Sequence, residues 1–248
     1  MTANAAVRFP SSPPHAAATE VARAKVTGRT PMEQLLHALN QPLTGLQCSM
    51  EVALAAPRTL EQYVRGLQDG LELTDRMRAL VGAIREVTDM EDKKNAVRNH
   101  EEWSIADVNT VLRTALDDLA PVAEVKGVRV EFERNGVGTC EGTSAMVAQR
   151  RVLETAAFRL FESALASAVT DSTLCIALGG DGGNPKMADW LRTSWHAGSP
   201  PSVVWRAEIG LLVSQASFEQ LGAAWERKCS GAIETVTIRL SGSTAKQP

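Results

Sequence analysis

The feature that most constrains the fold is an apolar repeat with helical spacing. It begins after Thr30-Pro31-Met32-Glu33, in which Thr30 can cap a helix and Glu33 can complete a capping box. The repeat recurs at alternating steps of three and four residues and consists of Leu36, Leu39, Leu43, Leu46, Met50 and Ala53. Such spacing is typical of helices in bundles, so it predicts a long first helix, which Pro42 should kink.

A second helix is predicted to follow the first almost at once. Ala56-Pro57-Arg58 breaks the first helix, and Thr59 with Gln62 forms a second capping box. Two apolar stripes then overlap: Leu60, Val64, Leu67, Leu71 and Thr74 form one, and Leu73, Met77, Leu80, Ile84 and Val87 the other. The short connection predicts an antiparallel hairpin. Because one partner helix cannot cover both stripes, we expect two hairpins to pair as a four-helix bundle in a homodimer.

Beyond residue 90 the pattern changes to alternating helices and strands. The predicted elements are a hinge at residues 91–95, a helix from 104 to 126, a strand at 128–133, a helical segment at 144–169, a strand at 174–178, a glycine-rich loop at 179–185, a short strand at 203–205, a helix at 209–221 and a strand at 234–240. A helical hairpin followed by mixed helices and strands predicts the α+β fold class.

The same patterns divide the chain into four segments. Residues 1–29 are rich in Ala, Pro and Ser and are predicted to be a disordered leader. The hairpin occupies residues 30–95, the α/β domain residues 104–241, and a tail residues 242–248.

Composition excludes several classes of function. A net charge of −3 gives no broad positive field for nucleic acid. The sequence contains no run of about 18 apolar residues, so no membrane span is expected. No signal peptide is recognisable either. The four cysteines are far apart and form no CxxC pair, which predicts reduced, buried thiols rather than zinc ligands or disulfides. We therefore expect a cytoplasmic protein.

Within the first helix, His37-Ala38-Leu39-Asn40-Gln41-Pro42-Leu43 resembles the phosphoacceptor segment of two-component histidine kinases. In that family a His is followed by a short polar run, a Pro and a Leu. Residues 106–133 and 209–240 are similar to the opening and closing parts of the family's ATP-binding domain. The resemblance covers residues 30–241 and implies a phosphoacceptor hairpin followed by an ATPase-like α/β sandwich.

The chemistry expected at His37 is that of a nucleophile. A neutral imidazole can attack a phosphoryl group near pH 7 and pass it on to an Asp carboxylate. His37 lies about 100° around the helix from Leu36, so it should point to solvent while Leu36 and Leu39 face the core. Gln41 lies one turn further on and could orient a water or a partner's Asp. A solvated histidine without a role is the alternative.

Three parts of the family's nucleotide site depart from its pattern. The residues that could still take part in cofactor binding are Glu162, Ser163, Asp181, Gly183 and Gly210. Arg159 and Ser163 stand where the family has two asparagines that hold Mg²⁺, and Pro185 replaces a glycine of the adenine loop. At the family's phosphate loop, only Gly210 remains where a Gly-x-Gly pair is expected. Ala38 stands where many of these kinases have an acidic base. ATP and Mg²⁺ are thus expected only if this weakened pocket functions, and we predict no cofactor and no metal site.

Three functions remain open at this point. The first is a histidine phosphotransfer protein that exchanges a phosphoryl group between His37 and a response-regulator Asp. The second is an active soluble histidine kinase that uses ATP, and the third is a non-enzymatic regulator that binds a receiver. The expected partners are a receiver domain, a second copy of the chain and an upstream hybrid kinase, with neither nucleic acid nor membrane.

Overall fold

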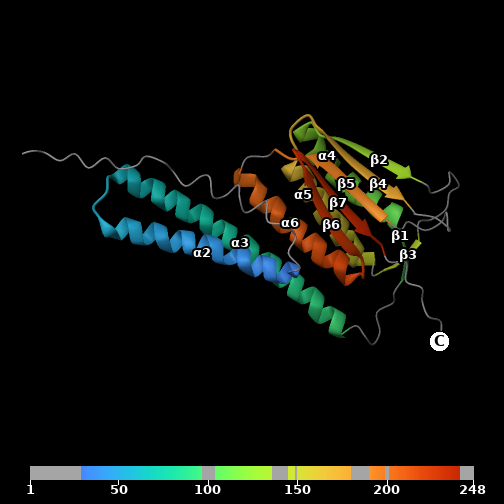
Figure 1. The fold of residues 1–248 in the computed structure, drawn as a ribbon, viewed down its shortest axis with the longest axis horizontal. Helices are drawn as coiled ribbons and strands as arrows, with labels where there is room; N and C mark the ends of the chain where they lie inside the picture. The colour runs from blue at the N-terminus through green and yellow to red at the C-terminus, as the bar shows by residue number, and fades with distance from the viewer. Residues whose placement is uncertain are drawn as a thin grey trace, which may run out of the picture.

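The computed structural model describes residues 29–96, 104–135, 145–148, 150–179, 190–198 and 201–240. It begins with two long antiparallel helices, α2 (Pro31–Ala55) and α3 (Leu60–Ala96), which form a hairpin (Figure 1). Both predicted capping boxes are formed. The Glu33 amide donates to Thr30 Oγ1 at 3.2 Å, and the Gln62 amide donates to Thr59 Oγ1 at 3.3 Å. These caps explain where the two helices begin.

The rest of the chain is a layer of helices on a mixed sheet. Its elements are β1 (Ser104–Asp107), α4 (Val108–Lys126), β2 (Arg129–Asn135), β3 (Ala145–Ala148), α5 (Arg150–Ser167), β4 (Thr173–Gly179), β5 (Trp190–His196), α6 (Pro201–Gln220), β6 (Ala224–Ser230) and β7 (Ile233–Arg239). The five-stranded sheet has the order β2-β4-β5-β7-β6, in which only the β2–β4 pair is parallel. The α+β class is confirmed.

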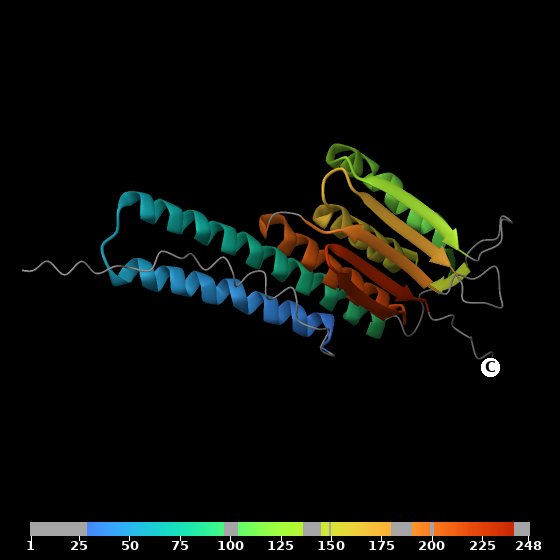
Figure 2. The same ribbon diagram turned by 45° about the horizontal axis from the view of Figure 1, so that its top comes forward.

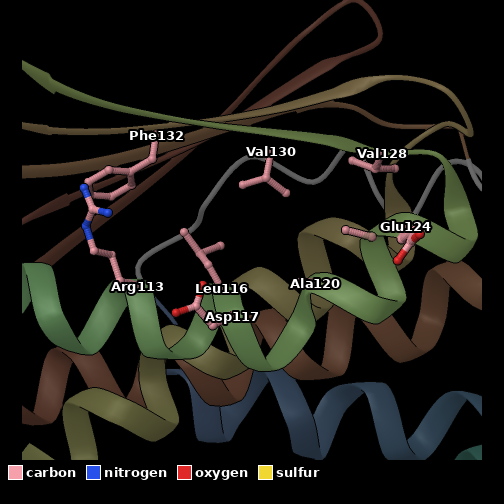
Figure 3. A pocket seen from close by; sticks show the side chains of 9 residues that line it. Arg113, Leu116, Asp117, Ala120, Glu124, Val128, Val130 and Phe132 are labelled. Atoms are coloured by element: carbon pink, nitrogen blue, oxygen red, sulfur yellow. The ribbon is translucent and has the colours of Figure 1, made fainter.

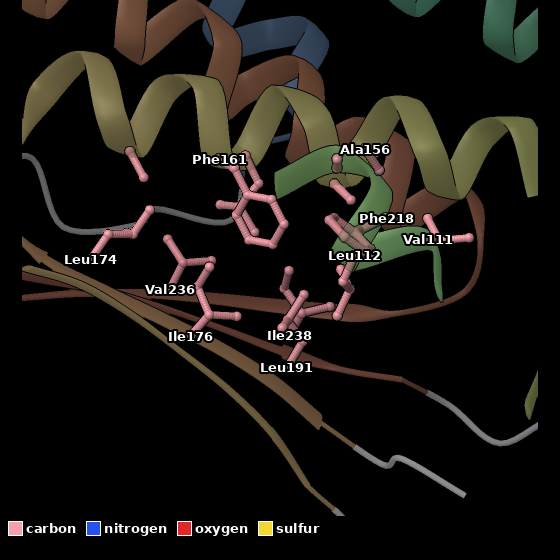
Figure 4. Packing of buried hydrophobic residues seen from close by; sticks show 14 of the residues in the cluster. Val111, Leu112, Ala156, Phe161, Leu174, Ile176, Leu191, Phe218, Val236 and Ile238 are labelled. Carbon is pink, nitrogen blue, oxygen red and sulfur yellow. The ribbon is translucent and has the colours of Figure 1, made fainter. Parts of the chain in front are cut away.

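Helices α4, α5 and α6 cover one face of this sheet (Figure 2). Alternate strand residues such as Leu174, Ile176 and Ile238 point toward the helices and are fully buried with Phe161 (Figure 4). The hairpin packs on α6, and its far end, where α2 meets α3, projects away from the sheet (Figures 1 and 2). The α/β part therefore contacts only the base of the hairpin.

Several predicted boundaries are wrong for local reasons. Residues 91–95, predicted as a hinge, continue α3, which ends at Ala96. Residues 104–107, predicted to start a helix, instead form β1, which pairs with β3. Helix α4 starts only after Asp107, whose Oδ1 accepts from the Asn109 amide at 3.2 Å. Since β3 occupies residues 145–148, the following helix begins at residue 150 rather than 144.

The region around Pro201 differs most from the prediction. Residues 203–205, predicted as a strand, lie in α6, which begins at Pro201. A proline suits the first turn of a helix because its missing N–H would be unpaired there in any case. Like β1 and β3, the strands β5 and β6 were not predicted. In β5, Leu191, Thr193 and Trp195 are buried, whereas Arg192 and His196 are exposed.

The hairpin and α6 share a second, smaller core. Its buried residues are Leu35, Leu80, Ala83, Val87 and Val213. Within the single chain, Leu35 is the fully buried residue of this turn and Leu36 is 47% exposed, so Leu36 does not face the core that one chain forms. The buried stripe of α2 is rotated because it must face α6 as well as α3.

Two further expectations concern exposure. The cysteines Cys48, Cys175 and Cys229, predicted to be buried, are instead free and exposed, while Cys140 lies outside the described residues. None of the helices described here combines the length and the apolar run that crossing a bilayer would require.

Candidate functional site

The turn of α2 that carries His37 lies where the hairpin meets α6. His37 itself is exposed, whereas Ala38 and Leu39 are partly buried and pack against the core shared with α6. Gln41, one turn on, is half-buried, and Pro42 is buried. The helix therefore holds the imidazole outward by anchoring the residues next to it. A reactant from solution can reach the ring.

Pro42 also changes the backbone of this turn. Proline has no N–H, so the Ala38 carbonyl lacks the hydrogen bond that residue 42 would normally donate. The helix nevertheless continues to Ala55, and the Thr44 hydroxyl donates to the Asn40 carbonyl at 2.9 Å. The site thus lies on a continuous helix in which the Ala38 carbonyl, beside His37, lacks its usual donor four residues on.

Arg159, which stands at an expected asparagine position, forms ion pairs in two directions. Its Nη1 lies 3.1 Å from Glu162 Oε2 on its own helix, and its Nη2 lies 3.1 Å from Glu86 Oε2 on α3. Burial lowers the pKa of the guanidinium, but the carboxylates of Glu86 and Glu162 outweigh it and raise that pKa above its ordinary value. Glu162 is therefore held beside a cation.

Ser163 and Gly210 meet where α5 and α6 cross. Ser163 is 2% exposed, and a Cβ added to Gly210 would lie 2.2 Å from its Oγ. One turn further along α6, the Ser214 hydroxyl donates to the Ala156 carbonyl of α5 at 2.8 Å. Glycine at position 210 thus permits direct contact between the two helices, as small residues do at close crossings.

The two remaining predicted residues, Asp181 and Gly183, lie outside the described residues. Within the described part of the chain, no group of three or more His, Cys, Asp or Glu side chains is placed to hold a metal ion. Of the predicted site residues, the structure therefore brings Ser163 and Gly210 together beside Glu162, and leaves His37 on α2.

A separate cleft of about 490 Å³ lies between α4 and β2 (Figure 3). Its floor is apolar and includes Leu116, Val130 and Phe132. Arg113 lies over the Phe132 ring, 5.5 Å from the ring centroid, at the rim of the cleft. None of the predicted site residues lines it, so the cleft is independent of His37.

Comparison with solved structures identifies the architecture. The histidine kinase AdeS of Acinetobacter baumannii matches 84% of this chain and 98% of its own, with 16% identity and a TM-score of 0.50. The chain has the histidine kinase fold. A histidine kinase of Burkholderia phymatum matches 85% of this chain and 98% of its own, with 15% identity and a TM-score of 0.47. Neither protein-family models nor curated proteins match the sequence.

One contact of this histidine kinase fold was missed in the sequence. Glu86 is 73 residues from Arg159 and lies on another helix, so no local pattern relates the two. In the sequence Glu86 is one of many charged residues of a long amphipathic helix, and nothing there shows that its side chain is turned toward α5. The one sequence feature that could have suggested an ion pair was Arg159 itself, because it places a cation where the resemblance predicts a metal-binding amide.

Proposed function

We propose that this protein is a histidine phosphotransfer component of a two-component system, which exchanges a phosphoryl group between His37 and a receiver Asp. The observation that carries the proposal is the exposed imidazole of His37 on a turn whose neighbours, Ala38, Leu39 and Pro42, are anchored. An exposed, oriented nucleophile is what attack on a partner's acyl phosphate requires.

The transfer is a displacement at phosphorus. A ring nitrogen of neutral His37 attacks the phosphorus of the receiver's aspartyl phosphate, a P–N bond forms, and the P–O bond to the aspartate breaks. The carboxylate leaves with its electron pair, and the proton on the other ring nitrogen of the attacking imidazole passes to solvent. Gln41, on the same face, is positioned to orient the approaching carboxylate or a water. The reverse sequence returns the phosphoryl group to a receiver.

Transfer between proteins is favoured over self-phosphorylation from ATP by the residues at the second site. Ala38 offers no carboxylate base, and it packs against the core shared with α6. Arg159 brings a positive charge to a position that would have to bind Mg²⁺, which costs electrostatic energy. Gly210 and Ser163 are in direct contact, which leaves no space between them for phosphates.

The test uses two sources of label. Receiver domains phosphorylated with ³²P should transfer label to this protein within minutes, and radiolabelled ATP with Mg²⁺ should not label it. Labelling by ATP alone would favour the active kinase instead. Binding of a receiver without movement of label would favour the non-enzymatic regulator. An inactive receiver with its Asp replaced by Asn is the control.

We also propose that the protein is a homodimer through the far half of the hairpin. Leu54, Leu60, Leu67 and Leu71 are 68–87% exposed in the single chain. The last three share one face of α3, because they are spaced seven and four residues apart. An apolar stripe of this size is costly to leave in water, and a second hairpin of the same shape would cover it.

Replacing Leu67 and Leu71 together by Lys should abolish this pairing. Two ammonium groups cannot be buried in an apolar interface, so we expect the mass in solution to fall from that of a dimer to the 26.6 kDa of one chain. Light scattering after size-exclusion chromatography measures this mass in solution. Val125→Lys, on α4, is the matched control, since Val125 is 92% exposed and lies away from the stripe. A wild-type protein of one-chain mass would contradict the dimer.

A further inference from the structure

The ion pair between Glu86 and Arg159 joins two parts of the molecule. Glu86 lies on α3 of the hairpin, and Arg159 lies on α5 of the α/β part, with 3.1 Å between Oε2 and Nη2. Their side chains are 30% and 38% exposed, so water screens the pair only in part. The guanidinium is a planar fork, and its other arm binds Glu162 on α5.

Two other contacts secure the same junction one turn further along α3. The Gln220 side-chain amide donates to the Met90 carbonyl at 3.0 Å, and the Ser217 hydroxyl lies 3.3 Å from Met90 Sδ. Between these contacts and the ion pair, Val213 of α6 is buried against Val87 and its neighbours. The junction therefore combines an apolar centre with polar contacts that have a defined geometry.

We propose that Glu86 and Arg159 form an interdomain clamp, which holds α5 and α6 against the hairpin so that α6 supports the turn of α2 carrying His37. Arg159 is in this view a positioning residue. The α/β part acts as a fixed support under the phosphoacceptor instead of a domain that moves to deliver a nucleotide. The clamp itself is independent of the proposed function, but its effect on phosphoryl transfer rests on that function.

The path from the clamp to His37 consists of contacts in one cluster. Arg159 and Gly210 meet where α5 crosses α6, since a Cβ on Gly210 would lie 3.8 Å from the Arg159 carbonyl. The adjacent Ile209 and Leu212 of α6 pack in the same cluster as Ala38 and Leu39 of α2. Release of α5 and α6 from α3 would therefore remove the support on one side of the His37 turn.

Two carboxylates on the same guanidinium give a matched pair of variants. Glu86→Gln weakens the bond between helices, whereas Glu162→Gln weakens a bond of equal length within α5. Amide hydrogen exchange of peptides covering residues 80–90 and 209–217 reports the opening of the junction. We expect Glu86→Gln to increase the exchange rate of these peptides about two- to fivefold, because a partly exposed ion pair contributes only a small stabilisation. Glu162→Gln should leave their exchange rate unchanged.

A double-mutant cycle separates the clamp from independent effects. Once Arg159→Met has removed the cation, adding Glu86→Gln should cause no further increase in exchange. Equal exchange in the Glu86→Gln and Glu162→Gln variants, or additive effects in the cycle, would overturn the clamp. Arg150→Met is the control for removing an arginine from α5, because the ion pair of Arg150 with Glu154 does not reach the hairpin. This variant should leave the exchange rate at the junction unchanged.

The consequence for transfer has its own measurement. In single-turnover transfer from a phosphorylated receiver, Glu86→Gln should lower the maximal rate about two- to fivefold and leave the half-saturating receiver concentration unchanged, because the site is less well oriented. An unchanged maximal rate would overturn the positioning role. If the wild-type protein accepts no label at all, the proposed function fails, and the exchange experiment alone still decides the clamp.

Discussion

His37→Ala should abolish phosphoryl transfer from a phosphorylated receiver. We expect the transfer rate to fall by more than about 1,000-fold, because the substitution removes the nucleophile itself. His37 is exposed on α2, so its replacement leaves no cavity, and the free energy of unfolding should change by less than about 0.5 kcal/mol. Radiolabel on the protein after rapid quenching measures the first effect, and thermal unfolding measures the second.

His196→Ala is the control for the loss of an imidazole. His196 is also exposed but lies at the end of β5, on the α/β part. This variant should accept label at the wild-type rate. A His37→Ala protein that still accepted label would place the phosphoacceptor elsewhere, and the proposal for this site would have to be withdrawn. Acid lability and base stability of the bound label would identify it as a phosphoramidate.

Gly210→Val should destabilise the α/β part by about 2–3 kcal/mol. A Cβ at this position already lies 2.2 Å from Ser163 Oγ, and the two methyl groups of valine would reach further into α5. Overpacking of this kind forces helices apart or side chains out of their rotamers. Chemical denaturation measures the free energy of unfolding, and a lowered midpoint with an unchanged slope is expected.

Gly66→Val is the matched control, since Gly66 also lies within a helix but has no atom within 4 Å of the position that a Cβ would take. That substitution should change the free energy of unfolding by less than about 1 kcal/mol. Ser163→Gly should recover part of the Gly210→Val loss, because it removes the atoms that clash. Equal stability of the Gly210→Val and wild-type proteins would show that α5 and α6 are not held in close contact.

The hairpin was predictable because its signals are local. Each capping box spans four residues, so Thr30 with Glu33 and Thr59 with Gln62 specify the helix starts without reference to the rest of the chain. The apolar repeats between them specify the length of α2. The structure confirms both starts and the antiparallel arrangement.

Elements that depend on distant partners were predicted poorly. The strand β1 exists because it pairs with β3, some 40 residues later, and its own four residues look like a helix start. Similarly, β5 is a central strand between β4 and β7, and its mixed sequence of Trp, Arg, Thr and Ser gives no clear alternation. Pairing partners, and not local propensity, decide these segments.

The site was predictable in part for the same reason. The outward position of His37 follows from the helical repeat around it, although the buried stripe is displaced from Leu36 to Leu35. That displacement comes from α6, whose position on the hairpin no sequence pattern indicates. The meeting of Ser163 with Gly210, 47 residues later in the chain, is likewise a product of helix packing and not of a motif.

Helix α3 is a single unbroken element of 37 residues, which makes it about 55 Å long. Its first turns carry the exposed stripe at the far end of the hairpin, and its later turns carry Leu80, Val87 and Met90 at the junction with α6. Because no break separates these segments, a twist imposed at the tip is transmitted along the helix as torsion. The tip and the sheet-bearing half of the molecule are therefore mechanically coupled through one continuous rod.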